Sequence, residues 1–160
     1  MYRKSGEQID VIVDEKPIYE GSFTVVGGNF DNAGEVSTNI KAILKKIGLC
    51  KDVVRKAALV AYESEINIVS YARKGMIRLR VVPDCIMIEA IDEGQGIPDI
   101  EQAMQPGFST ANQRIREMGF GAGMGLCNIK SFADAFQISS EVGKGTHLKM
   151  IIKANSSVIQ

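Results

Sequence analysis

Two polar side chains one helical turn apart carry the clearest chemical potential in this sequence. Glu63 and Asn67 lie within a stretch from Lys51 to about Lys74 whose apolar spacing predicts one long helix. At about 100° per residue, both side chains project from the face opposite the apolar one. A carboxylate can accept a proton as a general base, and an amide oxygen can bind Mg²⁺. The competing interpretation is an ordinary solvated face.

The predicted long helix has two distinct faces. Glu65 lies about 200° from Asn67 around the helix axis, so it points toward the apolar face and needs a polar partner there. The apolar face, expected to pack on a sheet, comprises Val54, Ala57, Ala58, Ala61, Ile68, Val69 and Ala72. The polar stripe comprises Lys56, Glu63, Asn67, Ser70 and Lys74.

An acidic residue at the end of a short apolar run forms the second candidate site. The run Cys85–Ile91 is bounded by turn residues and predicts a mostly buried strand, so Asp92 lies where that strand ends. Gly94 and Gly96 follow it, and glycine allows a tight turn or the close approach of a ligand to the backbone. Taken alone, the same pattern also fits an ordinary turn.

Glycine at every second position marks a third candidate site. The segment Gly119–Gly125 precedes apolar residues with helical spacing from Leu126 to Phe136. Unpaired amides at the start of a helix, together with the helix dipole, favour a bound anion. A flexible hinge without a ligand is the alternative.

Together with a glycine-rich turn near the C-terminus, these segments resemble the ATP-binding boxes of the GHKL (Bergerat-fold) superfamily in order and spacing. The matching segments are Glu63-x-x-x-Asn67, Asp92-x-Gly94-x-Gly96-Ile97, Gly121-Ala122-Gly123-Met124-Gly125-Leu126 and Gly143-x-Gly145-Thr146. Within the superfamily, the chain looks most like the small serine kinases of bacterial partner-switching systems. That similarity lies in residues 67–75 and 106–110 and exceeds the likeness to anti-sigma factors that hold a sigma factor directly.

The resemblance implies ATP and Mg²⁺ as cofactors and assigns roles to individual residues. Asp92 would accept the adenine amino group, helped by Thr146 through water, and Asn67 would hold Mg²⁺ on the phosphates. Glu63 would be the general base for a serine hydroxyl on a STAS-domain antagonist protein. Arg116, or Arg114 two residues before it, lies in the stretch 101–120 that would form the lid and would place positive charge near the γ-phosphate, although no motif fixes either. The remaining nucleotide contacts implied are Gly94, Gly96, Ile97, Gly121, Gly123, Met124, Gly125 and Leu126.

Two strands and a helix are predicted before the long helix. The strands flank a turn at residues 15–17, and the helix ends at Gly48. Asp31 or Asn32 is expected to cap the start of this helix. The positions that carry these predictions are Ile9, Val11 and Val13 in the first strand, Ser22–Val26 in the second, and Ala33, Val36, Ile40, Ile43, Leu44 and Ile47 in the helix.

Two antiparallel hairpins and a long connection complete the predicted elements. Met76–Val82 pairs with the strand that delivers Asp92, and Gln137–Val142 pairs with His147–Lys153. Residues 101–120 form a mobile connection with a short helix at its start, and a connection of this length favours a lid or binding loop. The order of elements predicts an α/β two-layer sandwich, with helices on one face of a mixed, mostly antiparallel sheet. The ATP pocket is expected between the helices and the lid, on the side of the helical layer away from the sheet.

The 160 residues fit one domain. Within it, residues 1–20 would add a strand or a homodimer contact, and residues 155–160 would form a frayed tail.

Composition also argues against several classes of protein. Lys plus Arg equals Asp plus Glu at 19 each, which does not favour nucleic-acid binding. No apolar stretch approaches the roughly 18 residues that span a bilayer, and three separated cysteines suit reduced thiols. A soluble cytoplasmic protein is therefore expected.

These observations give a leading hypothesis and alternatives. The first is an ATP-dependent serine kinase that phosphorylates a STAS-domain antagonist in a partner-switching system. The second is an ATP-binding anti-sigma factor or regulatory module whose nucleotide controls affinity for a partner, such as a sigma factor, without turnover. A histidine-kinase catalytic domain would need a separate phosphoacceptor protein, because His147 is the sole histidine. A gyrase-like ATPase would need a transducer domain.

Overall fold

A six-stranded sheet forms one layer of the computed structural model, which describes residues 2–4, 16–117 and 123–154. The strands follow the order β1-β5-β6-β4-β3-β2. Their bounds are Tyr2–Lys4 for β1, Tyr19–Val26 for β2, Ala72–Val82 for β3, Cys85–Gly94 for β4, Ala135–Glu141 for β5 and Gly145–Lys153 for β6. Every pairing between these described strands is antiparallel. The predicted antiparallel character is confirmed, whereas the prediction that the sheet is mixed is wrong.

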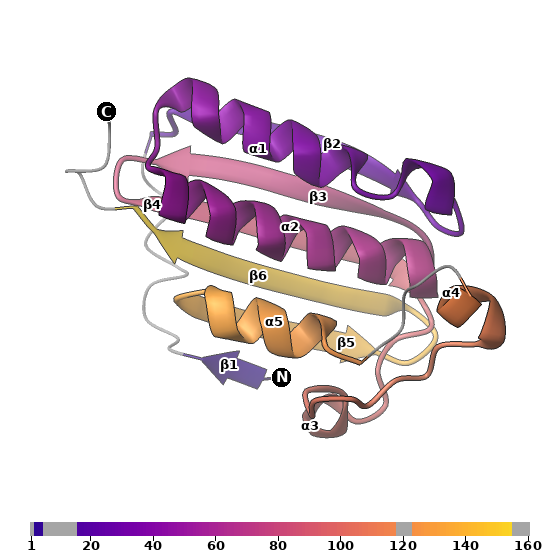
Figure 1. Ribbon diagram of the computed structural model, residues 1–160. Helices are drawn as coiled ribbons and strands as arrows, with labels where there is room; N and C mark the ends of the chain where they lie inside the picture. The colour runs from indigo at the N-terminus through magenta and orange to yellow at the C-terminus, as the bar shows by residue number, and fades with distance from the viewer. Residues whose placement is uncertain (1, 5–15, 118–122, 155–160) are drawn as a thin grey trace.

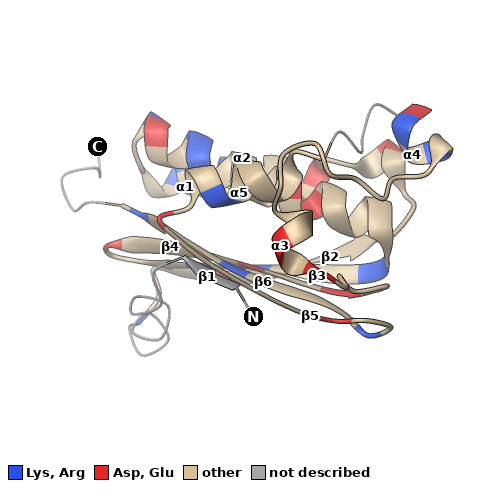
Figure 2. Ribbon diagram, turned by 90° about the horizontal axis from the view of Figure 1, so that it is seen from below, with Lys and Arg blue, Asp and Glu red and all other residues tan. Residues whose placement is uncertain are grey.

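Three helices cover one face of this sheet, as predicted for a two-layer sandwich. They are α1 (Glu35–Ile47), α2 (Lys51–Tyr71) and α5 (Gly125–Phe132). Figure 1 shows α2 over the middle of the sheet with α1 and α5 on either side of it, and Figure 2 shows all three helices on the same face. Two short helices, α3 (Ile100–Ala103) and α4 (Gln113–Glu117), lie in the connection between β4 and α5.

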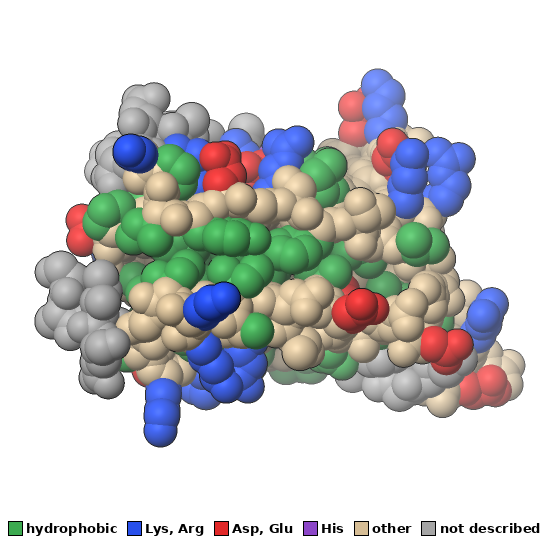
Figure 3. All heavy atoms as spheres, turned by 90° about the horizontal axis from the view of Figure 1, so that it is seen from above, with side chains coloured by type: hydrophobic (Ala, Val, Ile, Leu, Met, Phe, Trp, Pro, Cys, Tyr) green, Lys and Arg blue, Asp and Glu red, His purple; other side chains and the backbone are tan. Residues whose placement is uncertain are grey.

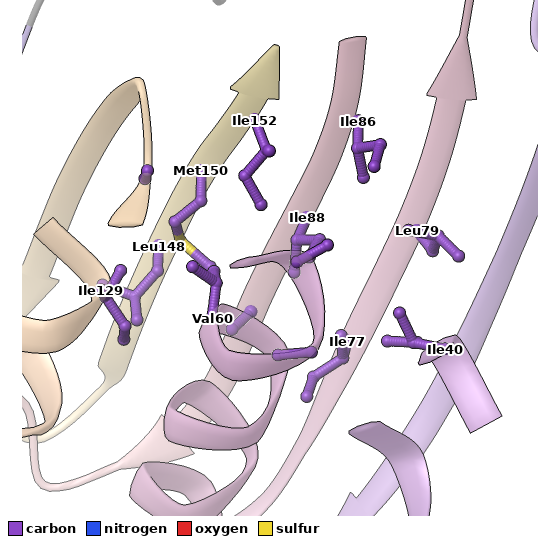
Figure 4. Close-up of a cluster of buried hydrophobic side chains, with 14 of the residues drawn as sticks. Ile40, Val60, Ile77, Leu79, Ile86, Ile88, Ile129, Leu148, Met150 and Ile152 are labelled. Atoms are coloured by element: carbon purple, nitrogen blue, oxygen red, sulfur yellow. The ribbon is translucent and has the colours of Figure 1, made fainter. Parts of the chain in front are cut away.

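The core lies between the two layers. In β3, Ile77, Leu79 and Val81 are buried against the helices while Arg78 is exposed, which confirms the predicted alternation. Figure 4 shows how side chains from three strands meet those from the helices. The labelled residues are Ile77, Leu79, Ile86, Ile88, Leu148, Met150 and Ile152 from the sheet and Ile40, Val60 and Ile129 from α1, α2 and α5.

At the side where α1 and β2 lie, the core reaches the surface. Tyr19, Phe23, Ile43 and Ile47 from these two elements are only partly buried while packing on the core. Seen from this side, hydrophobic side chains form a band that is bordered by backbone and other side chains, with charged side chains toward the edges (Figure 3).

Helix α1 begins later than predicted, and neither expected capping side chain caps it. Asp31 and Asn32 belong instead to a single 3₁₀ turn, Phe30–Asn32. Gly34 occupies the cap position in a left-handed conformation and has no side chain to offer. The predicted end at Gly48 is confirmed.

Glu65 of α2 supplies the cap that α1 lacks locally. Its carboxylate accepts hydrogen bonds from the backbone N–H groups of Gly34, Val36 and Ser37 at 3.1, 3.2 and 3.0 Å. Only 2% of Glu65 is exposed, and its negative charge faces the positive end of the α1 dipole. The polar partner predicted for Glu65 is therefore the start of the neighbouring helix.

Two helices end earlier than their apolar spacing predicted. Helix α2 ends at Tyr71, and Ala72 and Lys74 already belong to β3. Helix α5 ends at Phe132, and Phe136 lies in β5. In each case, hydrogen bonds to adjacent strands replace those of another helical turn, because pairing within the sheet outweighs local spacing.

The ends of the chain are described only in part. Tyr2–Lys4 adds an edge strand beside β5, one of the alternatives predicted for residues 1–20. The strand predicted through Ile9, Val11 and Val13 lies outside the described residues, as does the tail 155–160. Among the described helices, none combines the length and apolar character needed to cross a membrane.

Candidate functional site

A cavity of about 520 Å³ lies between α2, α5, the connection that contains α3, and residues of β4 and β6. Helices and the connection after α3 both line the cavity, which confirms the predicted position between helices and lid. Asp92 and Thr146 reach it from the sheet, so the prediction that it lies on the side of the helical layer away from the sheet is wrong. Segments distant in sequence therefore meet at one place. The predicted site residues that line it are Glu63, Asn67, Asp92, Gly96, Ile97, Gly123, Met124, Gly125, Leu126 and Thr146.

Two of the predicted site residues that the structure describes, Gly94 and Arg116, are not among those that line the cavity. Gly94 does not line the cavity but lies close to the Asp92 side chain: a Cβ added at Gly94 would be 2.9 Å from Asp92 Oδ1. Arg116 is exposed on α4, as is Arg114, so the structure brings neither to the cavity wall. Gly121 lies outside the described residues.

At one end of the cavity, α2 and the start of α5 approach closely. A Cβ at Gly125 would lie 3.2 Å from Glu63 Oε2 and 3.3 Å from Asn67 Oδ1, so a larger residue would crowd both polar groups. The Nδ2 atom of Asn128 donates a hydrogen bond to Glu63 Oε1 at 3.2 Å. The sequence analysis did not single out Asn128. The feature that could have indicated it is its position one helical turn after Gly125, on the predicted phosphate-binding turn.

At the other end, the Asp92 carboxylate is half-buried at the end of β4. Its Oδ1 atom accepts a hydrogen bond from the Thr146 backbone N–H at 3.2 Å. Burial raises the pKa of Asp92, and backbone hydrogen bonds from Thr146 and Gly94 partly oppose that shift. The cavity therefore contains a carboxylate acceptor in a partly desolvated setting.

Ser140 of β5 fixes the loop that follows Asp92. Its hydroxyl accepts from the Ile97 N–H at 2.8 Å, donates to the Gly145 carbonyl at 2.9 Å, and lies 2.9 Å from the Thr146 hydroxyl. Gly96 has a φ of +75°, and a Cβ there would collide with the carbonyl of Glu141. This loop thus packs directly on the β5–β6 hairpin, a contact that sequence reasoning also missed.

The polar stripe predicted on α2 divides into two parts. Glu63, Asn67 and Ser70 line the cavity, whereas Lys56 forms an ion pair with Asp52 at 3.2 Å on the surface. Within the described part of the chain, the Ser70 Oγ atom is the buried side-chain polar atom without a hydrogen-bond partner. Buried hydroxyls are normally paired, so this one indicates a ligand or water contact from the cavity side.

The connection over the cavity contains the predicted short helix, α3, and a second one, α4, that was not predicted. Its second part is closed at the base, because the Gly107 N–H, shortly after α3, donates to the Gly123 carbonyl, just before α5, at 3.0 Å. The Cys127 thiol of α5 donates to the Met104 carbonyl at 2.7 Å and so links α5 to the chain directly after α3. We call residues 108–122, between these contacts, the lid.

The donor set suits an adenine nucleotide. Asp92 offers an acceptor for an amino group, and Asn67 offers an oxygen suited to Mg²⁺. The first turn of α5 begins next to Asn67, and its free backbone N–H groups and the positive end of the helix dipole suit phosphate groups. Consistent with this, a protein-family model for a histidine kinase-like ATPase domain matches residues 29–152.

The chain belongs to the histidine kinase-like ATPase family.

Relatives of this ATPase-domain protein include named regulators. The anti-sigma F factor of Caldanaerobacter subterraneus subsp. tengcongensis is 35% identical over 118 residues, which cover 74% of this chain and 75% of the relative. The anti-sigma F factor of Thermoanaerobacter pseudethanolicus is 34% identical over the same shares of both chains. The serine/threonine-protein kinase RsbT of Bacillus subtilis is 36% identical over 115 residues, 68% of this chain and 79% of the relative. The family predicted from the four motifs is therefore confirmed, and ATP is its ligand.

Proposed function

We propose that the chain is an ATP-dependent protein serine kinase of a bacterial partner-switching system, which uses Mg²⁺ and phosphorylates a serine of a STAS-domain antagonist. The supporting observation is the Glu63 carboxylate, which lies beside Asn67 and the start of α5 in the cavity of an ATPase-family fold. The name of the similar serine/threonine-protein kinase RsbT gives further support.

Each residue would have a separate task in phosphoryl transfer. Asp92 would accept the adenine amino group, and Asn67 would hold Mg²⁺. The amides at the start of α5 would face the phosphates. Glu63 would take the proton from the attacking serine hydroxyl, a contribution typically worth about 10²–10⁴-fold in rate. Mg-ATP supplies the phosphoryl group when bound, and such transfer depends mainly on positioning and on neutralised charge.

The direct test is incubation of the protein with Mg-ATP and its STAS-domain antagonist, followed by mass spectrometry for phosphoserine. The E63Q variant should lower transfer by at least about 10²-fold while ATP binding stays within twofold of wild type. The matched control is E35Q, because Glu35 is exposed on α1 and absent from the cavity wall. Transfer by E63Q at the wild-type rate would contradict the proposed base.

The second candidate is an ATP-controlled anti-sigma factor without turnover. The relatives named anti-sigma F factor favour it. It predicts nucleotide-dependent capture of a sigma factor and no phosphoprotein after prolonged incubation. Phosphoserine formation that needs Glu63 would decide for the kinase.

A further inference from the structure

Asn128 lies within hydrogen-bond distance of the proposed base but outside the motifs that identify the family. We propose that Asn128 is a positioning residue: it holds Glu63 Oε1, so that Oε2 is the oxygen that receives the serine proton. This inference rests on the proposed kinase function and specifies how its base is oriented.

The position of Asn128 is fixed by the first turn of α5. Its backbone N–H donates to the Met124 carbonyl at 2.8 Å, which anchors the residue one turn into the helix. The side chain then reaches across to α2, where Nδ2 donates to Glu63 Oε1 at 3.2 Å. An ionised carboxylate only accepts hydrogen bonds, so the NH₂ group of the amide must face it. The contact thus has a defined direction.

The second carboxylate oxygen has a different environment. Glu63 Oε2 faces Gly125, where a Cβ would come within 3.2 Å, and the same Cβ would lie 3.3 Å from Asn67 Oδ1. Because Gly125 lacks that atom, Oε2 and the proposed metal-binding oxygen share an open corner of the cavity. One oxygen is therefore held by an amide donor, and the other borders the space that a substrate hydroxyl would occupy.

This arrangement meets a geometric requirement of general base catalysis, namely that the accepting oxygen be held at a fixed position. A glutamate has several rotatable bonds, and a base displaced by about 1 Å can lose about 10²-fold in rate. In the proposed step, serine Oγ forms the new P–O bond while its proton passes to Oε2. The electron pair of the broken P–O bond leaves with ADP. Asn128 also lines the cavity, and its proposed role is to act through Glu63 rather than on the reacting atoms.

The test compares variants of Asn128 in the full chain with Mg-ATP and the STAS-domain antagonist. N128A removes the donor and should lower kcat by about 10-fold, as expected for a hydrogen bond to a charged group, with KM for ATP within twofold. N128D keeps the size of the side chain but puts a carboxylate against Glu63, so it should lose at least as much. S131A alters an exposed residue of the same helix and should leave kcat unchanged.

A double-mutant comparison separates positioning from a merely structural role. In an E63Q background, N128A should cause no further loss of single-turnover rate, because the group that it positions is gone. Wild-type kcat in N128A or N128D, a parallel loss of ATP affinity, or full additivity with E63Q would each overturn the proposal. Absence of phosphoserine with the wild-type protein would overturn the kinase function itself and this inference with it.

Discussion

For Asp92, burial in the folded protein favours the neutral carboxyl group, whereas its proposed role as a hydrogen-bond acceptor for a ligand favours the charged carboxylate. Burial raises the pKa of Asp92 above its ordinary value of 3.8, because the folded protein disfavours its charged form. Between the unfolded and the folded pKa, the folded state binds more protons than the unfolded state. The stability that this group contributes is therefore greatest below pH 3.8 and is lost as pH rises through the folded pKa.

The D92N variant should therefore be more stable and bind ATP less well at pH 7. Replacement by a neutral amide removes the cost of the buried charge, so Tm of the nucleotide-free protein should rise, and the gain should shrink as pH falls toward 3.8. Loss of the charged acceptor should weaken ATP binding about 10-fold. Calorimetry across pH and an ATP titration would check both. A variant that is less stable at every pH would contradict this account.

Ser70 provides a second test at the level of a single atom. Its buried hydroxyl lacks a protein partner among the described residues and lines the cavity. The S70A variant should weaken ATP binding by about 2- to 10-fold, since one neutral hydrogen bond is lost. The nucleotide-free protein should keep its Tm or gain slightly. Unchanged ATP affinity, measured by isothermal titration, would mean that the hydroxyl does not contact the nucleotide.

How much of the site could be predicted depended on the distance between partners in sequence. Glu63 and Asn67 were predicted to be neighbours because helix geometry alone places them together. Asn128 is 65 residues from Glu63, and Ser140 is 43 residues from Ile97. No local pattern predicts such contacts, because they depend on how α5 and β5 pack against the rest of the fold.

Among the elements, the junction of α1 and α2 depends on one buried carboxylate. Glu65 accepts three backbone hydrogen bonds at the start of α1. The E65A variant should lower the free energy of unfolding by about 3 kcal/mol, because buried donors lose a charged acceptor. Urea denaturation would measure this. E35A, which changes an exposed acidic residue in the first turn of α1, should cost less than about 1 kcal/mol. Equal losses would mean that the cap contributes little.

The ends of the elements show where local spacing fails. The apolar spacing of α2 continued to Ala72, yet the chain enters β3 there and pairs with β4. The start of α1 was predicted from Asp31 and Asn32, whereas the observed cap comes from a residue about 30 positions later. Apolar periodicity predicts that an element exists, but its ends are decided by neighbours that the pattern does not contain.

At the scale of the whole molecule, the cavity joins both layers. Its walls come from α2 and α5, from β4 and β6, and from the connection with α3. A nucleotide bound there should stabilise the whole fold. At 100 times its Kd, Mg-ATP should add about 2.7 kcal/mol and raise Tm by about 5–10 °C.

Chelation supplies the control for that shift. Excess EDTA should reduce the increase in Tm with ATP, because Asn67 would lose the metal that links it to the phosphates. E63Q should keep the full shift, since its change affects proton transfer rather than binding. The same shift with and without EDTA would contradict a role for Mg²⁺.

The layered architecture was predictable because strands and helices have different apolar periods. Alternation in β3 and the wider spacing in α1 placed helices against a sheet, and the structure confirms this arrangement. The depth of the cavity was not predictable in that way. Asp92 and Thr146 reach it from the sheet, a position that depends on the loop held by Ser140.

The hydrogen bond between Gly107 and Gly123 closes the base of the lid on itself. This contact brings two positions 16 residues apart in sequence to one point just before α5. Insertions or substitutions between the two glycines are therefore expected to leave the start of α5, and with it the Gly125 corner of the cavity, in place.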